Sequence, residues 1–157
     1  MGCEIKVFAM DVDGTLTDGK IYIGNTGEVC KAFHIKDGMG IRMLAEHGII
    51  PVIITGRKSR IVEMRAKELG IEELYQGISD KGEALQEVLD RYGFRADQAA
   101  YIGDDINDLE VMAMAGISFA PADAVQKVRE CADVVLEAYG GNGAVREAAE
   151  YVLNKRS

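Results

Sequence analysis

Two aspartates, Asp11 and Asp13, stand directly after a short apolar run and before a glycine. The run, residues 5–10, predicts a buried strand, and residues two apart on a strand point the same way. Neighbouring buried carboxylates are unfavourable unless a cation lies between them, and Mg²⁺ is a hard ion that accepts carboxylate and carbonyl oxygens. The pair therefore predicts a metal site at a strand end. An Asx-turn that merely caps the strand is the alternative interpretation.

Further predicted strands are followed by polar residues of a similar kind. Thr55 follows the apolar run 49–54, Asp104 follows the run 99–102, and Lys81 opens a helix just past the short strand 74–75. In open α/β sheets, ligands bind beyond the carboxyl ends of the strands. We therefore expect these side chains to converge on Asp11 and Asp13.

These residue types match the requirements of phosphoryl transfer, which needs a nucleophile, an acid/base, a cation and further donors to phosphate oxygens. Asp11 offers a carboxylate nucleophile, and Asp13 can protonate a leaving alkoxide and then activate water. Thr55 offers a hydroxyl and the amides of a helix start, and Lys81 offers a fixed positive charge. Asp104 can complete the metal shell, supported by three residues of its own loop: Asp105, Asn107 and Asp108.

The elements that must position these residues alternate between apolar strands and amphipathic helices, which indicates an α/β fold with a Rossmann-like, doubly wound, mostly parallel sheet. Strands are expected at 5–10, 49–54, 74–75, 99–102, 117–120 and 134–136. Helices are expected from Asp37, as an N-cap, to about 47, then at 58–69, from Asp80, as an N-cap, to 92, and at 107–115, 125–131 and 145–153. We expect one domain over residues 1–157, with a flexible glycine-rich stretch at 140–143 before the last helix of the segment 140–157.

A β-hairpin is expected immediately after the aspartate pair. Residues 21–23 and 29–33 flank the turn-forming stretch 24–27, which contains two glycines and an asparagine. This flap, about residues 20–33, interrupts the alternation of strands and helices. We therefore expect it to overhang the site.

Composition excludes several classes of protein. The chain has 157 residues and a formal net charge of −8, which argues against nucleic acid as a partner because nucleic acid requires a basic surface. No apolar run approaches the ~20 residues of a membrane span. The three cysteines, Cys3, Cys30 and Cys131, form no C-x-x-C pair, which indicates neither a disulfide framework nor a zinc site. We expect a protein of the reducing cytoplasm, with no membrane partner.

The order of the motifs resembles the haloacid dehalogenase superfamily of phosphatases: D-x-D-G-T at 11–15, T-G-R at 55–57, Lys81, then G-D-D-x-N-D at 103–108. Within that superfamily, the chain is similar to the small family of 3-deoxy-D-manno-octulosonate 8-phosphate phosphatases. The matching stretches cover nearly the whole chain: 11–19, 21–22, 31–33, 37–41, 53–57, 75–77, 101–105 and 140–147. Thr15 departs from many close relatives, which have Val, but is ordinary in the wider superfamily.

The resemblance implies roles for these residues. Asp11 would be the nucleophile and Asp13 the acid/base, with Mg²⁺ held by Asp11, the backbone carbonyl of Asp13, and Asp104. Phosphate would be held by Thr55, Gly56 and Lys81. The family lacks a cap domain, and its members assemble as homotetramers in which the hairpin of one subunit covers a neighbour's site. The implied substrate is 3-deoxy-D-manno-octulosonate 8-phosphate; a nine-carbon sugar acid 9-phosphate (2-keto-3-deoxynononate or N-acetylneuraminate 9-phosphate) remains the alternative.

Four basic residues are candidates for substrate binding. Arg57 can meet a carboxylate or phosphate through its guanidinium fork, or be a solvated arginine at a helix start. The resemblance implies that its presence favours the eight-carbon substrate, because relatives that prefer nine-carbon substrates can lack the matching arginine. Arg65 lies within the apolar stripe of its helix, so it can point into the site or an interface, or snorkel to solvent. Lys31 in the hairpin and Arg146 near the start of the last helix can reach a neighbouring site, or be ordinary solvated side chains.

Two other functions also fit some of these features. A receiver-type signalling domain uses aspartates, a Thr and a Lys around Mg²⁺, but there the Lys comes last, whereas here Lys81 precedes Asp104. A non-catalytic scaffold domain can keep the same fold after losing catalytic residues, but none of the expected residues is missing here. The sequence therefore favours a Mg²⁺-dependent phosphatase acting on a sugar-acid phosphate.

Overall fold

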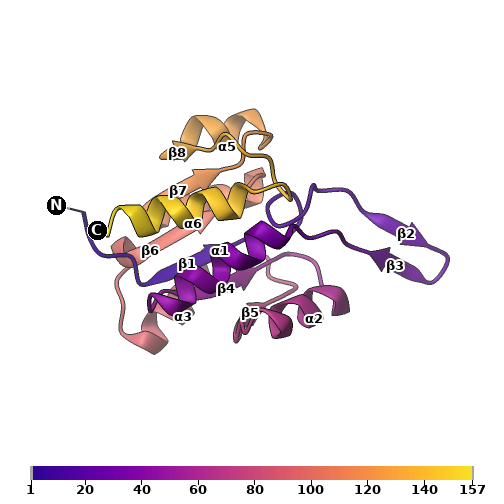
Figure 1. Cartoon of the computed structure of the whole chain (residues 1–157), viewed down its shortest axis with the longest axis horizontal. Helices are drawn as coiled ribbons and strands as arrows, with labels where there is room; N and C mark the ends of the chain where they lie inside the picture. Colours follow the sequence, from indigo (N-terminus) through magenta and orange to yellow (C-terminus); the bar gives the residue numbers. More distant parts are fainter. Residues whose placement is uncertain (1, 157) are drawn as a thin grey trace.

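A computed structural model describes residues 2–156, and its centre is a six-stranded sheet in which every pairing is parallel (Figure 1). The strand order is β5-β4-β1-β6-β7-β8. Strand β1 lies in the middle, paired with β4 on one side and β6 on the other, so the chain order reverses at β1. The strands are β1 (Val7–Met10), β4 (Ile50–Ile54), β5 (Glu73–Tyr75), β6 (Ala99–Ile102), β7 (Ile117–Ala120) and β8 (Val134–Val135).

Helices cover both faces of this sheet because β1 is apolar on both sides. Phe8 and Met10 point to a core built with α1, α2 and α6, whereas Val7 and Ala9 point to a core built with α3, α4 and α5. All four side chains of β1 are fully buried. The helices are α1 (Ile35–Glu46), α2 (Arg60–Glu68), α3 (Lys81–Tyr92), α4 (Leu109–Met114), α5 (Gln126–Cys131) and α6 (Ala144–Asn154), with short 3₁₀ turns η1 (Ala96–Gln98) and η2 (Ile106–Asp108).

The predicted hairpin is present between β1 and α1. Strands β2 (Tyr22–Gly24) and β3 (Gly27–Cys30) pair antiparallel and form a sheet of their own. Figure 1 shows this hairpin projecting from the body of the molecule at the edge where the strands of the large sheet end. The doubly wound fold is therefore confirmed, and within residues 2–156 a hairpin stands in place of any separate cap domain.

Most predicted elements are present, with shifted ends. Strand β1 begins at Val7 rather than at residue 5, and the expected helix over 107–115 is divided into η2 and α4. The N-cap prediction for Asp80 is confirmed, because its side chain accepts a hydrogen bond from the Glu83 amide.

The N-cap prediction for Asp37 is wrong. His34 caps α1 by accepting a hydrogen bond from the Lys36 amide, and Asp37 lies inside the first turn of that helix. Its carboxylate turns instead toward the start of α6 and accepts a hydrogen bond from the Arg146 amide. The prediction failed because spacing along the chain reports only local geometry. It cannot show that the Asp37 carboxylate faces a helix more than a hundred residues away.

In the part of the chain that the structure covers, residues 2–156, no helix combines the length and the apolar character needed to cross a membrane.

Candidate active site at the carboxyl edge of the sheet

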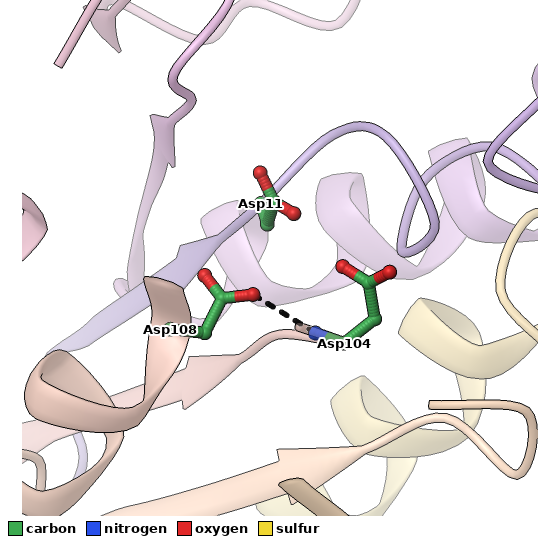
Figure 2. A group of neighbouring side chains, drawn as sticks. All are labelled: Asp11, Asp104 and Asp108. Carbon is green, nitrogen blue, oxygen red and sulfur yellow. Dashed lines mark hydrogen bonds between the residues drawn. The ribbon is translucent and has the colours of Figure 1, made fainter. Parts of the chain in front are cut away.

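Asp11 and Asp104 follow the two neighbouring strands β1 and β6, and their carboxylates face each other at the edge of the sheet (Figure 2). The Asp11 amide donates to the Ile102 carbonyl at 3.1 Å, which continues the pairing one residue past β1. One carboxylate oxygen each from Asp11, Asp104 and Asp108 lie within 4.8 Å of one another. The sheet register therefore brings Asp11 and Asp104 together, as the sequence predicts, and the third carboxylate of the cluster is Asp108 rather than Asp13.

The loop after Asp11 closes tightly around a single carbonyl. The amides of Thr15, Leu16 and Thr17 all approach the Val12 carbonyl, at 3.1, 2.8 and 3.1 Å. Gly14 has a φ of +90°, and a Cβ at this position would overlap the carboxylate of Asp104. Glycine is therefore required here both for its backbone conformation and for the close approach of the loop to Asp104.

Lys81 links two carboxylates of the cluster, those of Asp11 and Asp108. The Lys81 ammonium lies 3.0 Å from Asp11 Oδ1 and 2.8 Å from Asp108 Oδ1. Asp108 is fully buried, and it also accepts hydrogen bonds from the Tyr101 hydroxyl at 2.6 Å and from the amide of Asp104 at 3.0 Å. Because its oxygens are already engaged, Asp108 holds Lys81 and the Asp104 loop in place, while Asp11 and Asp104 remain available to a ligand.

The electrostatics of this cluster fit a divalent cation. Two buried carboxylates, Asp11 and Asp108, and the partly buried carboxylate of Asp104 lie together, and among the described residues Lys81 is the cation that pairs with them. Burial, together with the neighbouring Asp11 and Asp108 carboxylates, raises the pKa of Asp104 to about 9, and burial likewise raises the pKa of Asp11. Burial lowers the pKa of Lys81, but the Asp11 and Asp108 charges outweigh it, so the net shift is upward. Carboxylate oxygens are the ligands that Mg²⁺ prefers, so Asp11 and Asp104 are suited to hold it.

The carboxylate of Asp13 faces two cations rather than the acidic cluster. The Lys31 ammonium lies 2.6 Å from Asp13 Oδ1, and the Nε atom of Arg57 lies 3.8 Å from Asp13 Oδ2. The Lys31 side chain is only 2% exposed and also contacts Glu28 at 2.8 Å. Lys31 is therefore not a solvated strand lysine. Its ammonium group contacts Asp13 of the same chain.

Thr55 and Gly56 follow β4, the other neighbour of β1. Thr55 is buried, its amide donates to the Tyr75 carbonyl at 2.9 Å, and its own carbonyl accepts from the Ile78 amide at 3.1 Å. Both backbone groups of Thr55 are engaged, so its position at the end of β4 is well defined. Two of the residues expected to contact phosphate, Thr55 and Gly56, therefore follow the strand next to the one that precedes Asp11. The third, Lys81, contacts Asp11 directly.

Four predicted site residues lie outside these contacts. The Arg65 guanidinium stacks 5.5 Å over the Phe33 ring and pairs with Glu68 at 3.4 Å. Arg146 pairs with Glu150 at 2.7 Å on the exposed side of α6. The other two, on the Asp104 loop, are exposed: Asp105, whose side chain caps η2, and Asn107. Their assignment to substrate binding or to support of the metal stays a prediction.

Two supporting residues, Glu28 and Tyr101, are not indicated as site residues by the sequence motifs. Glu28 accepts hydrogen bonds from Lys31 and from the Ser59 hydroxyl at 2.6 Å, which ties the hairpin to the start of α2. Tyr101 donates to Asp108 from inside β6. The spacing of Glu28 three residues before Lys31, and a tyrosine within an otherwise apolar strand that ends at Asp104, were the available signals.

The similarities to known proteins agree with this site. Residues 70–147 match the haloacid dehalogenase-like hydrolase family. The chain is 48% identical over 150 residues to the 3-deoxy-D-manno-octulosonate 8-phosphate phosphatase KdsC of Yersinia pestis, covering 96% of this chain and 80% of that protein.

Two solved structures of such phosphatases are closely similar to this chain. The enzyme from Moraxella catarrhalis, in complex with magnesium ion, phosphate ion and KDO, has a TM-score of 0.93, with 44% identity over 96% of this chain and 87% of that one. The cobalt-bound enzyme from Haemophilus influenzae has a TM-score of 0.94 and 42% identity over 96% and 88% of the two chains. The chain therefore belongs to the family of 3-deoxy-D-manno-octulosonate 8-phosphate phosphatases, which are phosphoric monoester hydrolases.

Proposed function

We propose that this protein is a Mg²⁺-dependent phosphatase that hydrolyses 3-deoxy-D-manno-octulosonate 8-phosphate to the free sugar acid and phosphate. The observation that carries the proposal is the meeting of Asp11 and Asp104 at the ends of adjacent strands, with Lys81 against Asp11. The similarity to an enzyme whose crystal structure contains magnesium, phosphate and KDO supports both the metal and the substrate. A receiver domain is not favoured, because the chain belongs to a phosphatase family.

Asp11, Asp104 and the backbone carbonyl of Asp13 would hold the Mg²⁺ ion, which when bound neutralises negative charge on the phosphate oxygens. An oxygen of Asp11 attacks the phosphorus, and the bond from phosphorus to the sugar oxygen breaks. Asp13 donates its proton to the departing sugar oxygen, which leaves an aspartyl-phosphate. Asp13 then accepts a proton from water as the water oxygen attacks the phosphorus, which releases phosphate and restores Asp11.

The surroundings of Asp13 supply positive charge to an anionic substrate. Lys31 and Arg57 flank its carboxylate, and the Arg57 side chain is half exposed. A sugar acid phosphate carries a carboxylate and a phosphate, and the planar guanidinium matches either group. We assign Arg57 and Lys31 to substrate recognition, with Thr55, Gly56 and Lys81 at the phosphate. The same chemistry on a nine-carbon sugar acid 9-phosphate is the second candidate.

The hairpin supports a homotetramer in which it covers the site of a neighbouring subunit. Its apolar side chains are exposed in the single chain: Ile23 is 71% and Val29 is 64% exposed. Exposed apolar surface of this kind marks interaction sites. We further propose that the enzyme acts in the cytoplasm. A monomer with full activity would contradict the tetramer but not the phosphatase reaction.

The direct experiment measures phosphate release with Mg²⁺ from the octulosonate 8-phosphate and from the two nine-carbon analogues, with Asp11→Asn as the inactive control. A kcat/KM that favours the octulosonate by tenfold corresponds to about 1.4 kcal/mol of transition-state discrimination. Preference for a nine-carbon acid would change the substrate and leave the chemistry intact. Absence of turnover with all three compounds would favour a non-catalytic scaffold domain.

A further inference from the structure

We propose that Asp37, which lies outside the acidic cluster, is a positioning residue for the phosphatase reaction. Its carboxylate fixes the start of α6, and the glycine turn before α6 in turn holds the loop that carries Asp11 and Asp13 against Asp104. The inference rests on the proposed function and adds to it a residue that touches neither metal nor substrate.

Asp37 belongs to α1 but acts as a cap for α6. It is only 1% exposed, and its Oδ1 atom accepts a hydrogen bond from the Arg146 amide at 2.9 Å. The amides of Gly143 and Val145 also face this carboxyl group. Gly143, the N-cap position of α6, has no side chain that could do this. An acceptor from another helix therefore satisfies the free amides at the start of α6 and interacts favourably with its dipole.

Burial of the Asp37 carboxylate lowers the stability of the folded state. Its second oxygen, Oδ2, is buried and has no hydrogen-bond partner among the described residues. Burial raises the pKa of Asp37 despite the hydrogen bonds from the three amides. An amide side chain could accept the same hydrogen bond without burying a charge, so the positioning role requires an acceptor oxygen at this place rather than the charge itself. The close packing of α1 on α6, where a Cβ on Gly40 would lie 3.1 Å from the Arg146 Cα atom, explains why the carboxylate is sealed from water.

The turn before α6 rests directly on the catalytic loop. The Gly141 amide donates to the Thr15 carbonyl at 2.9 Å. A Cβ on Gly140 would overlap the Gly14 carbonyl, so the two backbones are in contact at this point. Gly14 in turn approaches the Asp104 carboxylate closely enough that it can carry no side chain. A continuous set of contacts therefore leads from the start of α6 to the predicted metal ligand Asp104.

Two further carboxylates hold the same turn. Asp123 accepts a hydrogen bond from the Gly140 amide at 2.9 Å, and Glu147 of α6 accepts from the amides of Glu137 and Ala138 at 3.1 and 2.9 Å. The first anchor comes from the loop after β7 and the second comes from within α6. Asp37 adds a link from the start of α6 to α1, where the Arg146 guanidinium also contacts the Lys36 carbonyl at 3.5 Å. Loss of the Asp37 carboxylate therefore loosens the start of α6 relative to the catalytic loop.

The test compares Asp37→Ala with Asp37→Asn, which keeps an oxygen acceptor for the Arg146 amide. For Asp37→Ala we expect kcat at least tenfold lower, KM changed less than threefold, and a severalfold weaker apparent Mg²⁺ affinity by calorimetry. Asp37→Asn should stay within threefold of the wild type. Hydrogen exchange at the Gly141 amide should be at least tenfold faster in Asp37→Ala. Asp133→Ala is the matched control, because Asp133 also accepts a hydrogen bond from a backbone amide, that of Ser118 at 2.8 Å, but lies before β8, whereas the turn follows β8.

A second variant keeps the inference testable where Asp37→Ala does not fold. Gly140→Ala forces a methyl group against the Gly14 carbonyl and should lower kcat at least tenfold, whereas Asn142→Ala, at an exposed position of the same turn, should not. Unchanged kcat in a folded Asp37→Ala or Gly140→Ala protein, or an equal loss in Asp133→Ala, would overturn the positioning role. Failure of the proposed function can be told apart from failure of this inference, because the wild type would then release no phosphate. Hydrogen exchange at the Gly141 amide would still show whether Asp37 fixes the turn before α6.

Discussion

The Lys31 ammonium lies 2.6 Å from the Asp13 carboxylate, so the base of the hairpin is joined to the proposed acid/base of its own subunit. Glu28 holds the same ammonium at 2.8 Å and accepts a hydrogen bond from the Ser59 hydroxyl. The hairpin therefore does more than project from the body: its base supplies a buried cation to the site.

Replacing Lys31 by methionine should lower kcat/KM about 10- to 100-fold, or about 1.4 to 2.7 kcal/mol, because Asp13 loses its closest cation. Steady-state kinetics with Mg²⁺ measures this change. Lys20→Met, at an exposed position before the hairpin strands, is the control and should have no effect. Equal kinetics for the two variants would remove Lys31 from the site.

Replacing Arg57 by alanine should raise KM more than it lowers kcat. Its half-exposed guanidinium lies 3.8 Å from Asp13 and can contact the anionic substrate without a share in bond breaking. Initial rates over a range of substrate concentrations separate the two parameters. Arg60→Ala, exposed at the start of α2, should leave KM unchanged. A KM for Arg57→Ala equal to that of the wild type would contradict the assignment.

Replacing Lys81 by methionine should abolish turnover and lower the free energy of unfolding by about 3 kcal/mol in the absence of Mg²⁺, because two buried carboxylates lose their shared cation. Urea denaturation measures the loss. Added Mg²⁺ should restore part of it in Lys81→Met, since a divalent ion binds beside Asp11 and stabilises the folded state. Stability that does not respond to Mg²⁺ in either protein would contradict the assigned metal site.

Replacing Glu73 by glutamine tests a pH dependence away from the site. Burial raises the pKa of Glu73, but hydrogen bonds from Tyr75, Arg91 and Tyr92 outweigh it, so the pKa lies below the ordinary value of 4.5. A lowered pKa in the folded state adds stability above pH 4.5, and this stability is lost as the pH falls through the folded-state pKa.

The wild type should therefore exceed Glu73→Gln in free energy of unfolding by about 1–2 kcal/mol at pH 7. The difference should shrink as the pH falls below 4.5, and thermal denaturation at several pH values measures it. Glu72→Gln, at the exposed neighbouring position, is the control. A difference that grows toward low pH would show that the sign of the Glu73 shift is opposite.

Short-range patterns in the sequence were sufficient for the order of strands and helices and for the convergence of Asp11, Asp104 and Lys81. An apolar run of four or more residues buried on both faces is typical of a central parallel strand, and polar residues after such strands collect at one edge. These predictions depend only on residues close in sequence and on a general property of parallel sheets.

Contacts between distant segments could not be read in the same way. Asp37 has the spacing of an ordinary N-cap for its own helix, but the chain folds it against the Arg146 amide, 109 residues away. Lys31 alternates with solvent-facing neighbours in the hairpin, but the turn of the chain after β3 buries it on Asp13.

The sequence by itself therefore determined the fold class and the chemical character of the site, because strand burial and residue type are local properties. Only the tertiary structure decided which carboxylate each cation meets and which helix each carboxylate caps. The physical reason is that hydrogen bonds and ion pairs act over about 3 Å, so they depend on how α1, α6 and the hairpin pack against the catalytic loop, and no spacing along the chain encodes that packing.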